Sequence, residues 1–390
     1  MMIIFENIQL SLVSASALAL LISLFISFLL IKTNTNFKFG SQNQKRLSSL
    51  NIIPLGGVAM ALSFFIAVRF LGEAGSNFIY ISFFALAIAF MGVIDDLVNL
   101  NWKIKIILQF LFVAIPVIYL NIYINIESII KIELNNYLNL FFTVFWVILL
   151  MNSINFTDNM DGFASLNTSF IAFALGVISF FFEQNYLADI SFILGFSIIG
   201  FLILNFPPAK IYMGDSGSLF IGFVLGFISI LFNWNPLNES LIYNSFTPVL
   251  LFFTIPLLDF LTVLTYRIKN NISPTTGGTD HISHRLLNKG YSVKRILIIF
   301  TGINLLVFFL LSLSIEVLVD KLCFLCCLLG LRAFFLSIEK DFLPYDEIDD
   351  VSIFFVRFEE IVSVFFLSFS ISLFISYLSG CHYQIVSFFS

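Results

Sequence analysis

Long apolar runs recur along the whole chain, and they restrict its fold more than any other feature of the sequence. Each run is about 20 residues long, which is the length that an α-helix needs to cross a hydrocarbon core of about 30 Å. Only 11% of the residues are charged, whereas a typical soluble domain is about 25% charged. A membrane β-barrel would show short alternating segments instead. The sequence therefore predicts an all-α polytopic membrane protein.

About 11–12 of these runs are candidate transmembrane helices. They are residues 10–31, 52–70, 78–94, 104–121, 137–151, 164–182, 187–204, 217–233, 246–266, 296–314, 321–337 and 361–378. Glu6 and no cation precede the first run, which favours a retained helix over a cleaved signal peptide. We expect one integral membrane domain over residues 1–390. Residues 45–295 carry its motifs, and residues 296–390 add C-terminal helices.

Lys and Arg concentrate in alternate connections between these runs. The first connection contains Lys32, Lys38, Lys45 and Arg46, and the ninth also holds several cations, whereas the even-numbered connections are nearly bare. By the positive-inside rule, the odd-numbered connections are cytoplasmic and the N-terminus is outside. Every polar motif falls on the same side, so we expect the catalytic loops to be cytoplasmic.

Two acidic segments interrupt the apolar pattern. Asp95 and Asp96 end the third run, where adjacent carboxylates need a cation or a proton. The segment "NSINFTDNMDGF" (152–163) repeats polar residues at a spacing of three, which places them on one face of a helical turn. A solvated helix end and an ordinary polar loop remain alternatives for the two segments.

A third segment, "MGDSGS", places Asp215 just before an apolar run. The free N–H groups of the first turn of a helix suit a phosphate, although Asp and Ser also serve as ordinary N-caps. Gly222 and Gly226 follow as a GxxxG pair, to which we assign close helix packing and no catalytic role.

A fourth segment, "GGTDHISHRL" (277–286), contains two of the three His in the chain. His281 and His284, with Arg285, supply several hydrogen-bond donors, and Arg can hold phosphate oxygens in bidentate fashion. A zinc site is the alternative, but no Cys or Glu nearby completes a ligand set. The four segments together offer hard oxygen ligands for Mg²⁺ and cationic donors for a diphosphate. That combination is typical of phosphoryl transfer, and the membrane location indicates a lipid substrate.

These residues resemble the polyprenyl-phosphate N-acetylhexosamine-1-phosphate transferases, the bacterial glycosyltransferase family 4 type. The resemblance covers roughly residues 45 to 295, with five motifs in the family's order. They are "IPLGGVAM", the Asp95–Asp96 pair with Lys105 and Gln109, the Asn152–Gly162 motif, "NFPPAKIYMGDSGSLFIGF" and "GGTDHISHRL". Asn159 stands where the family usually has Gly, and His-Ile-Ser-His replaces a run of His. The early motif also has Leu50 and Leu55 in place of His and Arg. These departures favour the branch that serves surface polysaccharides.

The resemblance implies that polyprenyl phosphate attacks the β-phosphorus of a UDP-N-acetylhexosamine and releases UMP. It implies catalytic roles for Asp95, Asp96 and Asp215, and Mg²⁺, with Mn²⁺ as an alternative, held by Asp215 and Asn155. It implies substrate-binding roles for Lys105, Asn152, Asp158, Asp161, Tyr212, His281, His284 and Arg285. Tyr212 would stack on uracil, and interfacial anchoring is the alternative. The implied setting is the bacterial inner (cytoplasmic) membrane, with no nucleic acid partner; a homodimer is left open.

Other functions fit the sequence less well. A secondary transporter of a small anionic solute would place ionisable groups near the middle of the membrane, but the spans are almost free of them, with Asp259 and Arg332 as the main exceptions. Asp259 is near the inner half of its span, where it could line the cleft. A CDP-alcohol phosphotransferase shares the start of Asp158-x-x-Asp161-Gly162 but needs downstream acids that are missing. Cys323, Cys326 and Cys327 lie in an apolar run and fit buried thiols better than a metal site. The acidic stretch 339–350 fits a solvated face.

Overall fold

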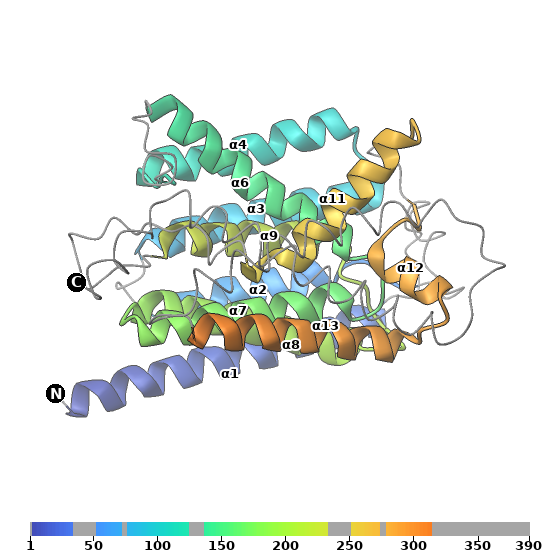
Figure 1. Cartoon of the computed structure of the whole chain (residues 1–390). Helices are drawn as coiled ribbons and strands as arrows, with labels where there is room; N and C mark the ends of the chain where they lie inside the picture. Colours follow the sequence, from blue (N-terminus) through green and yellow to red (C-terminus); the bar gives the residue numbers. More distant parts are fainter. Residues whose placement is uncertain are drawn as a thin grey trace, which may run out of the picture. The chain divides into compact units, whose positions relative to one another are not determined.

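The computed structural model describes residues 2–33, 52–71, 76–124, 136–232, 251–273 and 278–313, and within these ranges the chain is helical (Figure 1). The helices are α1 (Met2–Thr33), α2 (Gly56–Arg69), α3 (Ser76–Val98), α4 (Trp102–Leu120), α6 (Asn136–Thr157), α7 (Phe163–Phe181), α8 (Asn185–Asn205), α9 (Gly214–Leu231), α11 (Thr254–Lys269), α12 (Ile282–Asn288) and α13 (Val293–Leu313).

The all-α polytopic class is confirmed. In the described part of the chain, seven helices are long and apolar enough to cross a membrane: α1, α3, α4, α6, α7, α8 and α9. The helix α2 is apolar but shorter, with 14 residues. Two predicted spans, 321–337 and 361–378, lie outside the described residues, as do Cys323, Cys326, Cys327, Arg332 and the acidic stretch 339–350.

The chain divides into two compact units. The first comprises residues 1–124, 135–232 and 259–301, and the second comprises residues 125–134, 233–258 and 302–390. Every candidate site residue belongs to the first unit. A single domain over residues 1–390 stays a prediction.

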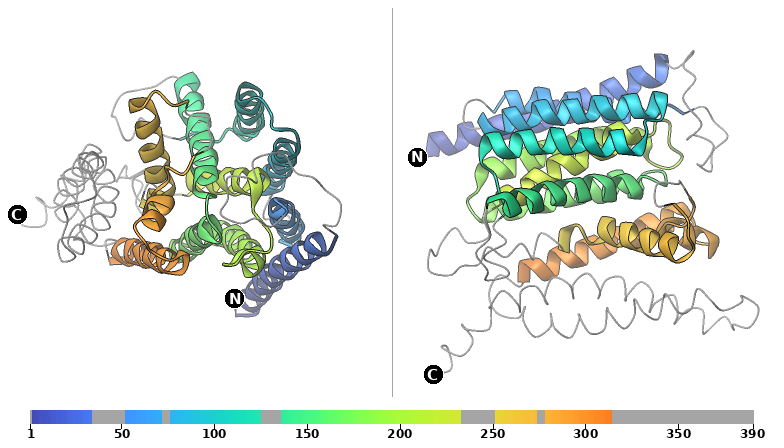
Figure 2. Two further views of the ribbon diagram at one scale, coloured as in Figure 1. Left: turned by 90° about the vertical axis from the view of Figure 1, so that its right-hand side faces the viewer. Right: turned by 90° about the horizontal axis from the view of Figure 1, so that it is seen from above.

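The helix α9 lies at the centre of the first unit. It packs against α2, α3 and α6 (Figure 2). Nearly all of its residues are buried. Small residues permit this close packing. A Cβ atom on Gly57 of α2 would overlap the backbone of Gly217, and one on Gly92 of α3 would overlap the backbone of Ser216. The start of α9 is therefore held between two neighbouring helices with no intervening side chains.

The pair Gly222 and Gly226 has the packing role that its spacing predicts. A Cβ atom on Gly222 would overlap the backbone of Met151 in α6, and one on Gly226 would lie 3.1 Å from a methyl group of Val147. These contacts bring the last turns of α6 alongside α9.

The polar motifs gather at one end of the first unit because their helices alternate in direction. Four of the five motifs lie at the beginning of α2, α4 or α9, or at the end of α3, α6 or α8, and the histidine motif leads into α12. The hydrogen bonds described below join these ends to one another. The structure thus places the motifs on one face, while the side of the membrane that this face occupies stays a prediction.

One predicted boundary was wrong. The sequence suggested that the fifth span ends at residue 151 and that a polar connection follows, but α6 continues to Thr157. Asn152 and Asn155 therefore lie in the last turns of a helix. Their amides find hydrogen-bond partners on neighbouring helices, so the helix can continue without leaving buried polar groups unpaired.

Candidate active site

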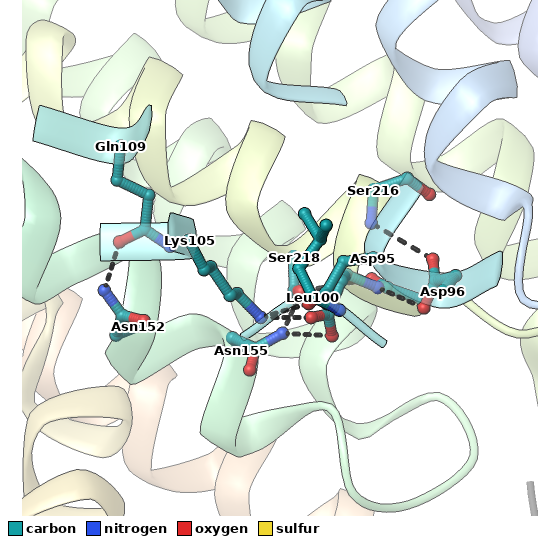
Figure 3. Close-up of polar contacts among 11 residues, drawn as sticks. Asp95, Asp96, Leu100, Lys105, Gln109, Asn152, Asn155, Ser216 and Ser218 are labelled. Atoms are coloured by element: carbon teal, nitrogen blue, oxygen red, sulfur yellow. Dashed lines mark hydrogen bonds and ion pairs between the residues drawn. The ribbon is translucent and has the colours of Figure 1, made fainter. Parts of the chain in front are cut away.

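An ion pair shared by two carboxylates forms the middle of the site (Figure 3). Lys105 Nζ, at the start of α4, donates to Asp95 Oδ2 at 2.7 Å and also contacts Asp215 Oδ2. The other oxygen of Asp95 accepts the backbone N–H of Leu100 at 2.7 Å. Asp95 is only 4% exposed. A buried carboxylate of this kind requires a cation, and Lys105 supplies one.

The neighbouring carboxylate, Asp96, caps the start of α9. Its two oxygens accept the backbone N–H groups of Asp215 at 3.2 Å and Ser216 at 3.4 Å. These are among the N–H groups that a helix leaves unpaired in its first turn, and a negative charge is favourable there. Gly214 has φ +69°, and a side chain at this position would run into Pro54 and Asp96. Asp96 thus fixes where the carboxylate of Asp215 is held.

Two amides from α6 complete this group. Asn155 Nδ2 donates to Asp215 Oδ1 at 2.7 Å and to Ser218 Oγ at 2.8 Å. One turn before Asn155 on α6, Asn152 Nδ2 donates to Gln109 Oε1 at 2.8 Å (Figure 3). Gln109 lies one turn after Lys105 on α4. We call Asp95, Asp96, Lys105, Asn155 and Asp215 the acidic centre. It joins the ends of four helices.

The turn after α6 is held by the last residue of α8. Asn205 Oδ1 accepts the N–H of Gly162 at 3.1 Å and the hydroxyl of Ser165 at 2.8 Å, while its Nδ2 donates to Ile211 O at 2.9 Å. Asp161 Oδ2 accepts the N–H of Ala209 at 3.0 Å. The Asp158–Gly162 turn is thus fixed to the segment that leads into α9.

The segment before α2 pairs with the segment before α9. Tyr212 N donates to Ile53 O at 2.9 Å, and Tyr212 O accepts the N–H of Gly56 at the same distance. The Tyr212 side chain is 2% exposed, beside Ile52 and Ala209. Stacking on a base would require this ring to be uncovered, so that role stays a prediction.

A second polar group surrounds residues 280–285, which we call the histidine segment. His281 Nδ1 lies 2.9 Å from Asp259 Oδ2, and Asp259 Oδ1 accepts the N–H of Ile282 at 2.8 Å. Ser283 Oγ donates to Oδ1 of Asn159, in the turn after α6. Burial and the nearby His281 lower the pKa of His284 below its ordinary value, which favours its neutral form.

An arginine from α11 anchors the beginning of the histidine segment. Arg267 donates from Nε to Asp280 Oδ2 at 2.7 Å and from Nη2 to Oδ1 at 2.9 Å. Burial alone would raise the pKa of Asp280, but these two hydrogen bonds lower it below its ordinary value. Arg285 Nε donates to the carbonyl of Asp280 at 3.0 Å, and its guanidinium lies over the ring of Tyr266.

Phe156 connects the two groups. It follows Asn155 of the acidic centre, and its ring meets His281 edge-to-face at a centroid distance of 5.8 Å. The Arg267 guanidinium lies 5.6 Å from the centre of the same ring. The histidine segment and the acidic centre therefore both contact the last turn of α6.

Known proteins are similar to this chain in sequence. Residues 78–233 match the profile of glycosyl transferase family 4. The chain is 30% identical over 212 residues to the probable undecaprenyl-phosphate N-acetylglucosaminyl 1-phosphate transferase of Bacillus subtilis, across 53% of this chain and 58% of that protein. It is 30% identical over 242 residues to the phospho-N-acetylmuramoyl-pentapeptide-transferase of Staphylococcus carnosus, across 55% of this chain and 75% of that protein. This chain belongs to the polyprenyl-phosphate N-acetylhexosamine-1-phosphate transferase family.

Most of the residues predicted for the site of this transferase lie close together in the structure. Asp95, Asp96, Lys105, Asn155 and Asp215 form one hydrogen-bonded centre, and Asn152 lies one turn away. His281, His284 and Arg285 lie in the histidine segment, and Asp158 and Asp161 lie in the turn between the two groups.

Sequence reasoning missed two residues that hold the site of this transferase together. Asn205 opens the "NFPPAK" motif but was given no role, and Arg267 was counted only as a cation in a connection. Asp259 was expected near the inner half of its span as a group that could line the cleft, but its partner His281 was not anticipated. Each is far from its partner in the sequence, so no local pattern indicates the contact.

The acidic centre suits a hard divalent cation. In the described part of the chain, no three His, Cys, Asp or Glu side chains are arranged as a metal cage. Mg²⁺, however, is usually bound by one or two carboxylates together with substrate phosphates. Asp215 provides such a carboxylate, and the amide of Asn155 lies beside it, with Nδ2 donating to Asp215 Oδ1.

Proposed function

We propose that this chain transfers N-acetylhexosamine 1-phosphate from a UDP-sugar to polyprenyl phosphate. The observation that carries the proposal is the acidic centre, where three carboxylates, an amide and a lysine from four helix ends meet. The names of the two relatives support it, since one specifies undecaprenyl phosphate and both specify an N-acetylated sugar and transfer of its phosphate. The product would be a polyprenyl-diphosphate sugar, the first lipid-linked unit of a surface glycan.

In this reaction an oxygen of the lipid phosphate forms a bond to the β-phosphorus of the UDP-sugar. The bond between that phosphorus and the bridging oxygen breaks, and UMP leaves with the bridging oxygen. We assign to Asp95 and Asp96 the positioning or deprotonation of the lipid phosphate. Both carboxylates are already hydrogen-bonded: Asp95 accepts from Leu100 N–H and Lys105 Nζ, and Asp96 accepts two backbone N–H groups. In phosphoryl transfer, positioning and charge neutralisation account for most of the catalysis.

Asp215 and Asn155 would hold Mg²⁺, or Mn²⁺, in this centre. When bound, the ion supplies positive charge to the diphosphate as its negative charge redistributes. Lys105 lies against the same carboxylate and would be close enough to hold a phosphate oxygen. His281, His284 and Arg285 approach from the other side of the last turn of α6, where they would bind the rest of the diphosphate. Asp158 and Asp161 would line the uridine and sugar side.

The excess of Lys and Arg in alternate connections supports a site on the cytoplasmic side of a bacterial inner membrane. A cytoplasmic face would give access to a soluble UDP-sugar, and the membrane boundary would give access to a lipid. Association of two copies remains an expectation from the resemblance.

The test is release of UMP by the purified protein. The assay combines undecaprenyl phosphate, Mg²⁺ and, in separate reactions, UDP derivatives of N-acetylglucosamine, N-acetylgalactosamine, N-acetylfucosamine and N-acetylquinovosamine. We expect UMP with at least one sugar, and only when the lipid is present. Folded protein that releases no UMP with any of them would refute the proposal.

A further inference from the structure

Asp259 is a buried carboxylate for which the proposed reaction gives no role. It is 1% exposed, and both of its oxygens are engaged, one with His281 Nδ1 at 2.9 Å and the other with the N–H of Ile282 at 2.8 Å. Burying a carboxylate is costly unless it is well paired. A carboxylate retained in this place, against one His and the backbone beside it, indicates that the orientation of His281 matters.

The contact decides which nitrogen of His281 faces outward. A carboxylate oxygen can only accept, so Nδ1 is the donor, and Nε2 is left for another partner. Within the described ranges, Nε2 forms no hydrogen bond. The edge-to-face contact with Phe156 holds the plane of the ring. A ring protonated on both nitrogens would offer Nε2–H to an anion while Asp259 balances its charge.

We propose that Asp259 is the positioning residue of His281, which it holds with Nε2–H directed toward a phosphate oxygen of the nucleotide diphosphate. This inference rests on the proposed function, because that phosphate belongs to its donor substrate. The last turn of α6, which carries Asn155 and Phe156, sets His281 next to the acidic centre. Asp259 acts through His281 and does not itself touch the substrate.

A second contact fixes the same segment. Asn159 and Ser283 both lie where the motifs depart from the family's pattern, and their side chains are hydrogen-bonded to each other. Asn159 Nδ2 also donates to Phe156 O at 2.8 Å and lies 3.5 Å from Asp259 Oδ2. Asp259 therefore holds the segment at residues 281–282, and Asn159 holds it at the next residue.

Other charged groups surround His281 and enter any pH dependence. They are Asp280 and Arg285 of the histidine segment, His284 with its ring centroid 6.2 Å from that of His281, and Arg267, which lies over the ring of Phe156. Arg267 and Asp280 neutralise each other in a bidentate pair, so Asp259 is the carboxylate left to balance a charged His281.

Nitrogen NMR on the whole protein tests the protonation state directly. The chain contains three His, at 281, 284 and 382, so a ¹⁵N-histidine sample gives three rings, and His281→Gln assigns the one of interest. We expect Nδ1 of His281 to be protonated in the wild-type protein, and we expect the Nε2–H signal to shift when UDP is added. A ring with its only proton on Nε2, unaffected by UDP, would overturn the proposal. This spectrum needs no Asp259 variant to fold.

Kinetics of Asp259→Asn provide the second test. An amide cannot accept both N–H groups, so either His281 or Ile282 loses its partner. We expect KM for the UDP-sugar to rise about tenfold or more, and activity to be lost at a lower pH on the alkaline side. Thr265→Ala is the matched control on α11, because the Thr265 hydroxyl bonds only to carbonyls of its own helix.

The two proposals fail in different ways. Wild-type protein that releases no UMP with any sugar refutes the proposed function. Wild-type protein that turns over, with an Asp259→Asn variant that has the same KM and the same pH profile, refutes the role of Asp259 alone.

Discussion

Replacing Lys105 by Met should make the protein bind a divalent cation more tightly. Lys105 Nζ contacts the carboxylate of Asp215, which we expect to hold Mg²⁺. At an effective dielectric constant of about 20, two unit charges about 4 Å apart interact by about 4 kcal/mol, so a lysine and a divalent ion would repel each other by about 8 kcal/mol. The ammonium must therefore withdraw when the ion binds. Its removal should tighten the ion by at least about tenfold, or about 1.4 kcal/mol.

The same variant should be less stable when no divalent ion is present. Removing one partner of a buried ion pair typically costs about 3–5 kcal/mol, and here Asp95 and Asp215 both lose their cation. An ion at about 100 times its Kd restores about 2.7 kcal/mol, and at about 1,000 times it restores about 4.1 kcal/mol. The variant should therefore gain more thermal stability from Mg²⁺ than the wild-type protein does.

Two measurements on detergent-solubilised protein check this. Thermal unfolding after EDTA treatment, with and without added MgCl₂, reports the stability, and electron paramagnetic resonance of Mn²⁺ reports the affinity. Lys103→Met is the control, because Lys103 lies over the ring of Trp102 and does not contact the acidic centre. An Mn²⁺ affinity in Lys105→Met equal to or weaker than that of the wild-type protein would refute the competition between the lysine and the ion.

Three further predictions follow from the site. Asp215→Asn should lower turnover by about a thousandfold or more, or about 4 kcal/mol, through loss of metal charge at the diphosphate, while normal membrane insertion and retention on size exclusion check the fold. Asn205→Leu should lower the unfolding temperature strongly, because Gly162 N–H and Ile211 O lose their partner at about 1–3 kcal/mol each and the Ser165 hydroxyl loses the shorter of its two hydrogen bonds; Asn270→Leu, at an exposed position, is the control. Acidification below about pH 6.5 should destabilise the protein, because the pKa of His284 is lower in the folded protein and the unfolded chain therefore binds the proton more readily. In His284→Gln the unfolding temperature should depend less on pH over this range.

The outcomes that would contradict these three are distinct. Normal turnover by Asp215→Asn would remove that residue from the metal role. An unfolding temperature for Asn205→Leu equal to that of Asn270→Leu would show that the turn after α6 is held by other contacts. An equally steep loss of stability with acid in His284→Gln would assign the effect to another group.

Much of the fold could be predicted because the length and hydropathy of a segment are enough to identify a membrane helix. The acidic centre could also be anticipated, since Asp95, Asp96, Asn155 and Asp215 all lie where a polar motif meets the end of an apolar run. Alternating helix directions then bring these ends together, whatever the details of packing. For this reason, a site built from helix ends can be predicted from the sequence.

The pairing of side chains between helices could not be predicted from the sequence. Lys105 was expected to bind substrate, and its contacts with two carboxylates depend on how α4 packs beside α3 and α9. Asn152 was expected in a connection and instead bonds to Gln109 inside the helical part. The partners Arg267 and Asp280 are 13 residues apart with no periodic pattern between them. Such pairs are set by helix rotation and register, which composition and spacing do not determine.

The most direct measurement follows each phosphorus of the donor to its product. A UDP-sugar that supports UMP release is prepared with ³²P in either the α- or the β-position, and the purified protein is incubated with undecaprenyl phosphate and Mg²⁺. Cleavage between the β-phosphorus and the bridging oxygen predicts that the β-label appears in the lipid and the α-label in UMP. Recovery of the β-label in soluble UDP, with sugar alone on the lipid, would contradict transfer of the sugar 1-phosphate.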